Sequence, residues 1–204
     1  MKFLLAFALM MSLCALSVVT EAKDDDHNFR ARLSGYHEVH FIGGAAPALR
    51  GAISTKASGR FEAKIDQTDS SIDYVIHYEG LESDVTQSHI HFGQRHTVGG
   101  IVVWLCQTTG TPAPGAVAAA TPFCPGAREG TVRGTITASQ VLEATGQGIA
   151  AGEFDEVLRA IRAGAAYANV HSTTFTPGEI RGQIKVVRGN DDRGDDHNRK
   201  DDKH

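Results

Sequence analysis

The chain has 204 residues and a formal net charge of −4 with histidine counted as neutral. This length allows one domain with a complete core, and the negative charge without a basic stripe argues against nucleic acid as a partner. Hydrophobic residues make up 41% of the chain, and 22 glycines separate short alternating segments. This pattern predicts many turns and an all-β fold.

Residues 1–22 have the pattern of a secretory signal peptide. Lys2 supplies a positive start, Phe3 to Val19 form an apolar run, and small residues Thr20 and Ala22 precede the expected cleavage point. The run is shorter than the roughly 20 residues of a membrane span, and acidic residues follow it. We therefore expect a secreted or periplasmic protein with no membrane span after cleavage, and a flexible lead-in at residues 23–28.

Strand patterns follow in chain order. Period-two alternation predicts strands over residues 29–40, 51–56, 59–66 and 72–79, the last with Ile72, Tyr74, Ile76 and Tyr78 facing inward. A strand centred on residues 88–93 comes next. The uninterrupted apolar run at 101–105 is typical of a strand buried on both faces. Further strands are predicted at 130–137, 165–171 and 179–186, with Glu179 and Arg181 on the polar face of the last.

One short helix is predicted near residues 153–163, because Phe154, Val157, Leu158 and Ile161 repeat at helical spacing. Residues 188–204 are almost entirely charged or polar, which predicts a disordered tail that cannot contribute to a core. The folded domain is therefore expected to span residues 29–187.

Two cysteines, Cys106 and Cys124, remain after removal of the signal peptide. An even pair in an exported protein favours a disulfide, which would close a loop rich in Thr, Pro, Ala and Gly. In the chain-entropy description, closing such a loop stabilises the fold by about 3 kcal/mol. Paired cysteines are not available as nucleophiles.

Three histidines are the candidate metal ligands. His89 and His91 alternate with Ile90 in a predicted strand and therefore lie on one face, while His171 belongs to a distant strand. Imidazoles suit copper, zinc or iron, and His96 is a further candidate ligand.

Asn169 and Glu179 are candidates to orient the ligands, and Arg181 is a candidate to guide an anion toward them. Two structural interpretations stay open. The histidines could instead hydrogen-bond loop carbonyls, and Arg181 and Glu179 could pair with each other or with neighbouring strands.

Three separated motifs resemble the CHRD (chordin) domain family. They are Leu33-Ser34-Gly35 followed by Glu38-Val39, then Ser88 to Gly93 with Gly99-Gly100-Ile101-Val102, and finally Tyr167 to Ser172 with Pro177 to Ile184. The resemblance covers residues 29–187 and implies an extracellular, immunoglobulin-like or superoxide-dismutase-like antiparallel β-sandwich. Because the family includes chordin, an extracellular antagonist of growth factors, an extracellular protein is a further candidate partner.

The sequence shows no set of nucleophile, general base and cofactor loop, so we assign no catalytic residues and favour binding over catalysis. The first hypothesis is a secreted module that holds a transition metal or a small polar ligand at the histidines. A copper-dependent enzyme resembling superoxide dismutase is one alternative. A purely structural or adhesive module is another.

Overall fold

The computed structural model describes residues 26–42 and 49–187. The expected signal peptide, residues 23–25 of the expected lead-in and the expected charged tail lie outside these ranges. Within them no helix is long and apolar enough to cross a membrane.

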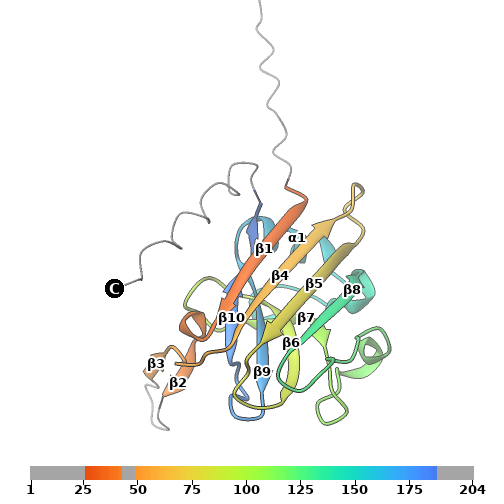
Figure 1. Ribbon diagram of the computed structural model, residues 1–204. Helices are drawn as coiled ribbons and strands as arrows, with labels where there is room; N and C mark the ends of the chain where they lie inside the picture. Colours follow the sequence, from red (N-terminus) through yellow and green to blue (C-terminus); the bar gives the residue numbers. More distant parts are fainter. Residues whose placement is uncertain (1–25, 43–48, 188–204) are drawn as a thin grey trace, which may run out of the picture.

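The regular secondary structure of the described chain is mostly β-strand (Figure 1). The strands are β1 (Asn28–Ser34), β2 (His40–Ile42), β3 (Leu49–Gly51), β4 (Ser58–Ile65), β5 (Ile72–Glu79), β6 (Val85–Phe92), β7 (Gly100–Cys106), β8 (Gly130–Ile136), β9 (Ala166–Ser172), β10 (Ile180–Gln183) and β11 (Lys185–Val186). Short 3-10 turns are η1 (Gly35–His37), η2 (Gly115–Ala119), η3 (Ala138–Gln140) and η4 (Thr145–Gln147), and the helix is α1 (Phe154–Arg162). The predicted all-β class with one short helix is confirmed.

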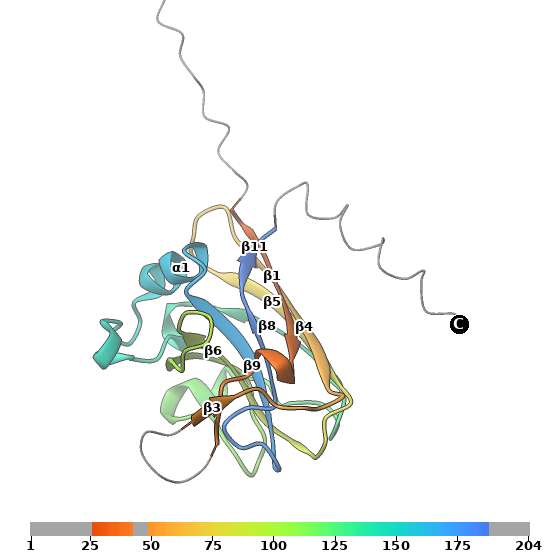
Figure 2. The same cartoon turned by 90° about the vertical axis from the view of Figure 1, so that its left-hand side faces the viewer.

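One antiparallel sheet supplies both layers of the fold. Its strand order is β7-β6-β9-β10-β1-β4-β5-β8, with β11 also paired to β1, while β2 and β3 form a separate hairpin. The two end strands, β7 and β8, approach each other, so the sheet nearly closes on itself. Across the core, the Tyr74 hydroxyl of β5 donates to the Leu105 carbonyl of β7 at 2.6 Å. The curled sheet therefore behaves as a sandwich (Figures 1 and 2).

The core follows the predicted alternation. In β5 the four apolar residues that alternate from Ile72 to Tyr78 are buried, whereas β7 is buried from Val102 to Cys106. The apolar side chains of α1 join the same cluster, and the helix contacts β9 and β11 (Figure 2).

The predicted strand at 51–56 is wrong. Only Gly51 belongs to a strand, and the segment that follows is irregular. Its polar groups form hydrogen bonds outside any strand ladder: the Ile53 N–H donates to the Gly35 carbonyl, and the Thr55 hydroxyl donates to the Glu179 carboxylate. Alternation of residue types cannot distinguish such a covering segment from a strand.

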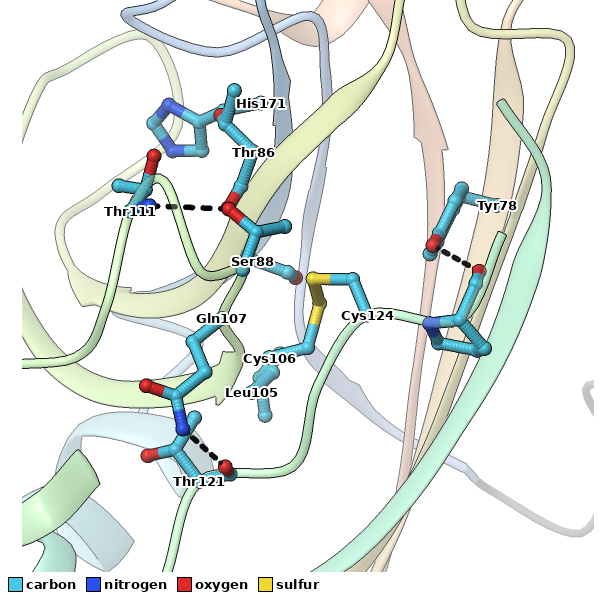
Figure 3. Close-up of a disulfide and its surroundings, with 12 residues drawn as sticks. Tyr78, Thr86, Ser88, Leu105, Cys106, Gln107, Thr111, Thr121, Cys124 and His171 are labelled. Atoms are coloured by element: carbon cyan, nitrogen blue, oxygen red, sulfur yellow. Dashed lines mark hydrogen bonds between the residues drawn. A yellow bond between two sulfur atoms is a disulfide. The ribbon is translucent and has the colours of Figure 1, made fainter. Parts of the chain in front are cut away.

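The predicted disulfide joins Cys106 and Cys124, whose Cα atoms lie 5.1 Å apart. Figure 3 shows it beside Gln107, whose side-chain amide donates to the Thr121 carbonyl at 2.6 Å. The Gln107 side-chain oxygen accepts from the Ala113 N–H at 2.9 Å. A buried amide and a covalent bond together order a loop that has little apolar content.

Candidate metal centre

The candidate ligands lie on the outer face of the sheet. Ile90 of β6 and Val170 of β9 are completely buried in the core, so their neighbours along each strand point the other way. Antiparallel pairing of β6 with β9 sets His89 opposite Asn169. This register brings side chains about 80 positions apart in sequence onto one patch.

His89, His91 and His171, which we call the histidine triad, meet on this patch. One potential ligand atom from each lies within 4.8 Å of the other two. His89 Nδ1 and His171 Nε2 are 3.2 Å apart. Two nitrogens bound to one tetrahedral ion at about 2.0–2.1 Å lie roughly 3.4 Å apart. The closest pair is near that spacing, although it is hydrogen-bonded in the metal-free protein, and a separation of 4.8 Å would have to shorten by roughly 1.4 Å.

Two backbone carbonyls define the protonation of the triad. The Gly99 carbonyl lies 3.0 Å from His91 Nδ1, and the Thr176 carbonyl lies 2.7 Å from His171 Nδ1. A carbonyl only accepts, so each Nδ1 carries the proton and each neutral ring has its lone pair on Nε2. The triad thus presents electron pairs rather than N–H groups at these two positions.

The triad also contains polar atoms without partners. The Nε2 atoms of His89 and His91 are buried and have no hydrogen-bond partner among the described residues. Leaving a buried polar atom unsatisfied costs about 1–3 kcal/mol. Each of these atoms calls for an explanation beyond packing.

Burial keeps the three rings neutral. It lowers the pKa of His91 to about 4 and that of His171 to about 4, because charging a desolvated imidazole is unfavourable. The pKa of His89 falls well below its usual value of 6.5 for the same reason, with a further contribution from the other two imidazoles. Neutral imidazole is the form that binds metal.

Aromatic rings fix the orientation of the triad. Trp104 and His89 make an edge-to-face contact with ring centroids 4.4 Å apart, while Tyr167 stacks on His91 with centroids 4.7 Å apart and an interplanar angle of 3°. The Arg181 guanidinium lies over the Tyr167 ring, with its central carbon 3.3 Å from the ring centroid. Arg181, Tyr167 and His91 thus form one column.

Arg181 is buried rather than solvent-facing, contrary to the expectation from alternation. It is 2% exposed and donates to the carbonyls of Thr97 and Gln94 at 2.6 and 2.9 Å. The turn between β6 and β7 therefore covers the polar face of β10. This guanidinium holds the turn whose Gly99 carbonyl binds His91.

Asn169 lies beside the triad, because its Cα pairs across the sheet with that of His89. Its side chain interacts with both His91 and Glu38, and in each case it opposes the pKa shift that burial causes: it raises the pKa of His91 and lowers that of Glu38. Sequence reasoning missed Glu38, which is 7% exposed. Burial raises the pKa of its carboxyl, although the Val39 N–H, the Arg181 charge and Asn169 each act to lower it. Its place in the opening Leu-Ser-Gly…Glu-Val motif was an available signal. Tyr167 could also have been found, since it alternates with Asn169 and His171.

Two other candidates are placed elsewhere. Glu179 is completely buried, but its Oε1 accepts from the Thr55 hydroxyl at 2.8 Å and the Glu82 N–H at 2.9 Å. It therefore fastens the covering segment rather than a histidine, and it does not form the alternative ion pair with Arg181. His96 is exposed, has a φ of 65°, and is not among the grouped ligands.

Comparison with known families gives one result. The CHRD domain model matches residues 29–184, which is most of the chain. Among curated proteins and among solved structures, none matches the chain.

Proposed function

Because the chain belongs to the CHRD domain family, we propose that it is an extracellular binding module that holds one transition-metal ion at the histidine triad. Copper, zinc and iron are the candidate metals, since imidazole suits all three. CHRD domains are extracellular, and the Cys106–Cys124 disulfide is compatible with an oxidising compartment. Export through the signal peptide at residues 1–22 is part of this proposal.

The proposal depends on one observation: the buried Nε2 of His91 has a lone pair but no hydrogen-bond partner among the described residues. His91 belongs to a group of three rings that burial keeps neutral, and one ligand atom from each ring lies within 4.8 Å of the others. An ion bound there would use the lone pair of His91 Nε2, which now has no partner, together with His171 Nε2 and His89 Nδ1, which now bond to each other. It would also meet the usual arrangement in which the second ring nitrogen of a ligand binds a backbone carbonyl.

A purely structural role explains only part of this geometry. The bonds of His91 to Gly99 and of His171 to Thr176 do hold loops against the sheet. They involve only the Nδ1 atoms of these two rings, however, and leave the buried Nε2 of His91 without a partner. The structural role and the metal-binding role are therefore compatible, and the second accounts for what the first leaves unexplained.

The dismutase-like alternative has no supporting observation in the described residues. His96 does not join the triad, and Arg181 lies against Tyr167 with both terminal nitrogens donating to turn carbonyls. These positions supply neither a fourth imidazole nor a free guanidinium over the metal position. We therefore propose binding, and no turnover, as the activity of the triad.

Calorimetric titration of the EDTA-treated mature chain with Cu²⁺, Zn²⁺ and Fe²⁺ tests the proposal. We expect one ion per chain, and loss of that uptake in the His89→Ala plus His91→Ala variant. The matched control is His37→Ala plus His77→Ala, which removes two histidines outside the triad and should bind as the wild type does. Circular dichroism checks that each variant folds.

The outcomes separate the hypotheses. A ligand that binds only the folded state raises the melting temperature, by an amount set by its concentration relative to Kd. If no metal is taken up, or if uptake and the melting shift survive in the His89→Ala plus His91→Ala variant, the metal proposal fails. Superoxide consumption by the copper-loaded chain above the uncatalysed rate would contradict the assignment as a non-enzymatic module.

A further inference from the structure

Asn169 lies at the centre of the patch that carries the histidine triad. Its Cα pairs with that of His89 on β6 and with that of Arg181 on β10, so these three residues form one row across three strands. Side chains that oppose each other in such a row have Cβ atoms about 4.5–5.5 Å apart. Asn169 also alternates with His171 along β9, so the two side chains share a face. The amide is 2% exposed and is therefore buried beside the rings of the triad.

Two buried acceptors of this patch have no donor. The Gly99 carbonyl fixes the proton of His91 on Nδ1, which leaves a lone pair on Nε2. The side-chain oxygen of Asn169, Oδ1, is also an acceptor only. Neither atom has a hydrogen-bond partner within residues 26–42 and 49–187. Because two acceptors cannot satisfy each other, the nitrogen calls for a cation and the oxygen calls for a proton donor.

The orientation of the Asn169 amide follows from its two neighbours. Against the larger effect of burial, Asn169 acts to raise the pKa of His91, as an acceptor near an imidazole does, and to lower the pKa of Glu38, as a donor near a carboxylate does. The atomic positions agree, since a Cβ built at Gly178 would lie against both Oε2 of Glu38 and Nδ2 of Asn169. The amide nitrogen therefore faces the carboxylate, and Oδ1 faces the ring of His91.

Glu38 is held in place independently of the triad. Its Oε1 accepts from the Val39 N–H at 2.8 Å, and its own N–H donates to the Gly35 carbonyl at 3.1 Å. The side chain is 7% exposed, and it does not belong to the group of potential ligands. Glu38 can thus orient the Asn169 amide without contacting an ion.

The donor that Asn169 Oδ1 lacks can come from the coordination sphere of the ion. Three imidazoles leave one position of a tetrahedral ion unfilled by protein. Amide oxygens suit Mg²⁺, Ca²⁺ and Mn²⁺, whereas imidazoles suit copper, zinc and iron, so Asn169 is better placed to accept a hydrogen bond than to bind the ion itself. A water molecule at the fourth position would give a lone pair to the ion and a proton to Oδ1.

We propose that an ion at the histidine triad keeps its fourth position for an exchangeable water molecule, which donates a hydrogen bond to Asn169 Oδ1, and that Glu38 is the positioning residue that orients this amide. This inference rests on the proposed function, because it needs an ion at the triad. It goes further by assigning an open coordination position, at which a small ligand can replace the water.

The test is azide titration of the Co²⁺-loaded mature chain at pH 8. The visible absorption of Co²⁺ depends on its ligands, so it reports both occupancy of the triad and replacement of the water. Azide binds the ion but has no proton to donate, and in the wild type it leaves Asn169 Oδ1 without a partner. Asn169→Leu has no such oxygen to leave unsatisfied. We therefore expect this variant to bind azide about threefold or more tightly than the wild type, with Co²⁺ still bound at one ion per chain.

Glu38→Gln tests the positioning role separately. With an amide in place of the carboxylate, Asn169 can turn its nitrogen toward the ion and donate to azide, which should lower the Kd of azide by about threefold or more. In the Asn169→Leu background the same change should alter that Kd less than about twofold, because a positioning residue acts through its partner. The charge control is Glu179→Gln, which removes another buried carboxylate whose Oε2 also has no hydrogen-bond partner in the described part of the chain. It should change the Kd of azide less than Glu38→Gln does.

The outcomes separate this inference from the proposed function. If the wild type takes up no Co²⁺, the proposed function fails and this inference fails with it. If Co²⁺ binds but azide leaves its absorption unchanged, or if Asn169→Leu weakens Co²⁺ binding by about tenfold or more, as loss of a direct ligand would, the fourth position is closed and only this inference is overturned. Equal azide affinity in wild type and Asn169→Leu overturns it as well. Circular dichroism checks that each variant folds, and Glu38→Gln is the conservative variant should Asn169→Leu unfold.

Discussion

Acidification should destabilise the metal-free protein through the histidine triad. Each ring is neutral in the fold, and the unfolded chain binds protons at the ordinary histidine pKa of 6.5, whereas His91 and His171 bind them at about 4. Between these values the unfolded state carries more protons, so the free energy of unfolding falls as the pH falls. At pH 5 relative to pH 8, each of these two histidines contributes a loss of about 2 kcal/mol. Together they remove about 4 kcal/mol.

Urea denaturation in EDTA at pH 8, 6.5 and 5 measures this loss. Other groups also titrate in this range, so the informative quantity is the difference between the wild type and His91→Gln. That variant should lose about 2 kcal/mol less than the wild type on going from pH 8 to pH 5, whatever its stability at pH 8. The control His77→Gln removes an imidazole on the polar face of β5. Parallel pH dependence in wild type and His91→Gln would refute the neutral buried triad.

Three further predictions concern binding and packing. Metal affinity should change less than about threefold between pH 8 and 5.5, whereas three unperturbed imidazoles would lose about a thousandfold; a calorimetric pH series checks this. Gly178→Ala should destabilise the fold by more than about 2 kcal/mol, because Gly178 has a φ of 133° and a Cβ there would meet the Glu38 carboxylate. Gly146→Ala is the control, since a Cβ at Gly146 would have no atom within 4 Å. Equal urea midpoints for the two variants would contradict the argument. Cys106→Ser plus Cys124→Ser should cost about 3 kcal/mol in urea unfolding, and less than 1 kcal/mol would show that the loop is ordered without the bond.

Much of the fold could be predicted because alternation reports which face of a strand is apolar. That reasoning placed Ile72 and Tyr78 inward, placed His89 and His91 together opposite Ile90, and identified the single helix. It named His171 only as a candidate third ligand, since its position beside the other two depends on the β6–β9 pairing and its register. Which strands pair depends on how the whole core packs, and the residues of one strand do not determine it.

Burial of the polar face was the part that alternation could not show. Arg181 reads as solvent-facing from the sequence, because charged residues alternate with apolar ones along its strand. In the structure the 94–97 turn and the segment near Thr55 cover that face. The turn is hydrogen-bonded to Arg181 and the segment to Glu179, the two charged residues whose presence had suggested exposure. A motif containing Gly, Glu and Arg thus marked a covered polar layer rather than a surface.

The contribution of His89 to the free energy of unfolding, with and without metal, distinguishes a metal ligand from a residue that only stabilises the fold. In the metal-free protein its Nδ1 donates to His171 Nε2 at 3.2 Å, and its own Nε2 has no partner. Replacing His89 with Leu removes one unsatisfied nitrogen and creates another, on His171. These two changes are of similar size, about 1–3 kcal/mol each, and of opposite sign. Leu also gains from burial at a position with no exposure.

His89→Leu should therefore change the free energy of unfolding by less than about 1 kcal/mol without metal, while removing most of the stabilisation that metal gives the wild type. Paired urea titrations of both proteins, with and without Zn²⁺, measure the two quantities together. His171→Leu is the comparison, because it also breaks the 2.7 Å bond to the Thr176 carbonyl and should cost more without metal. If His89→Leu is as destabilising as His171→Leu and Zn²⁺ stabilises neither protein nor the wild type, His89 serves the fold and not an ion.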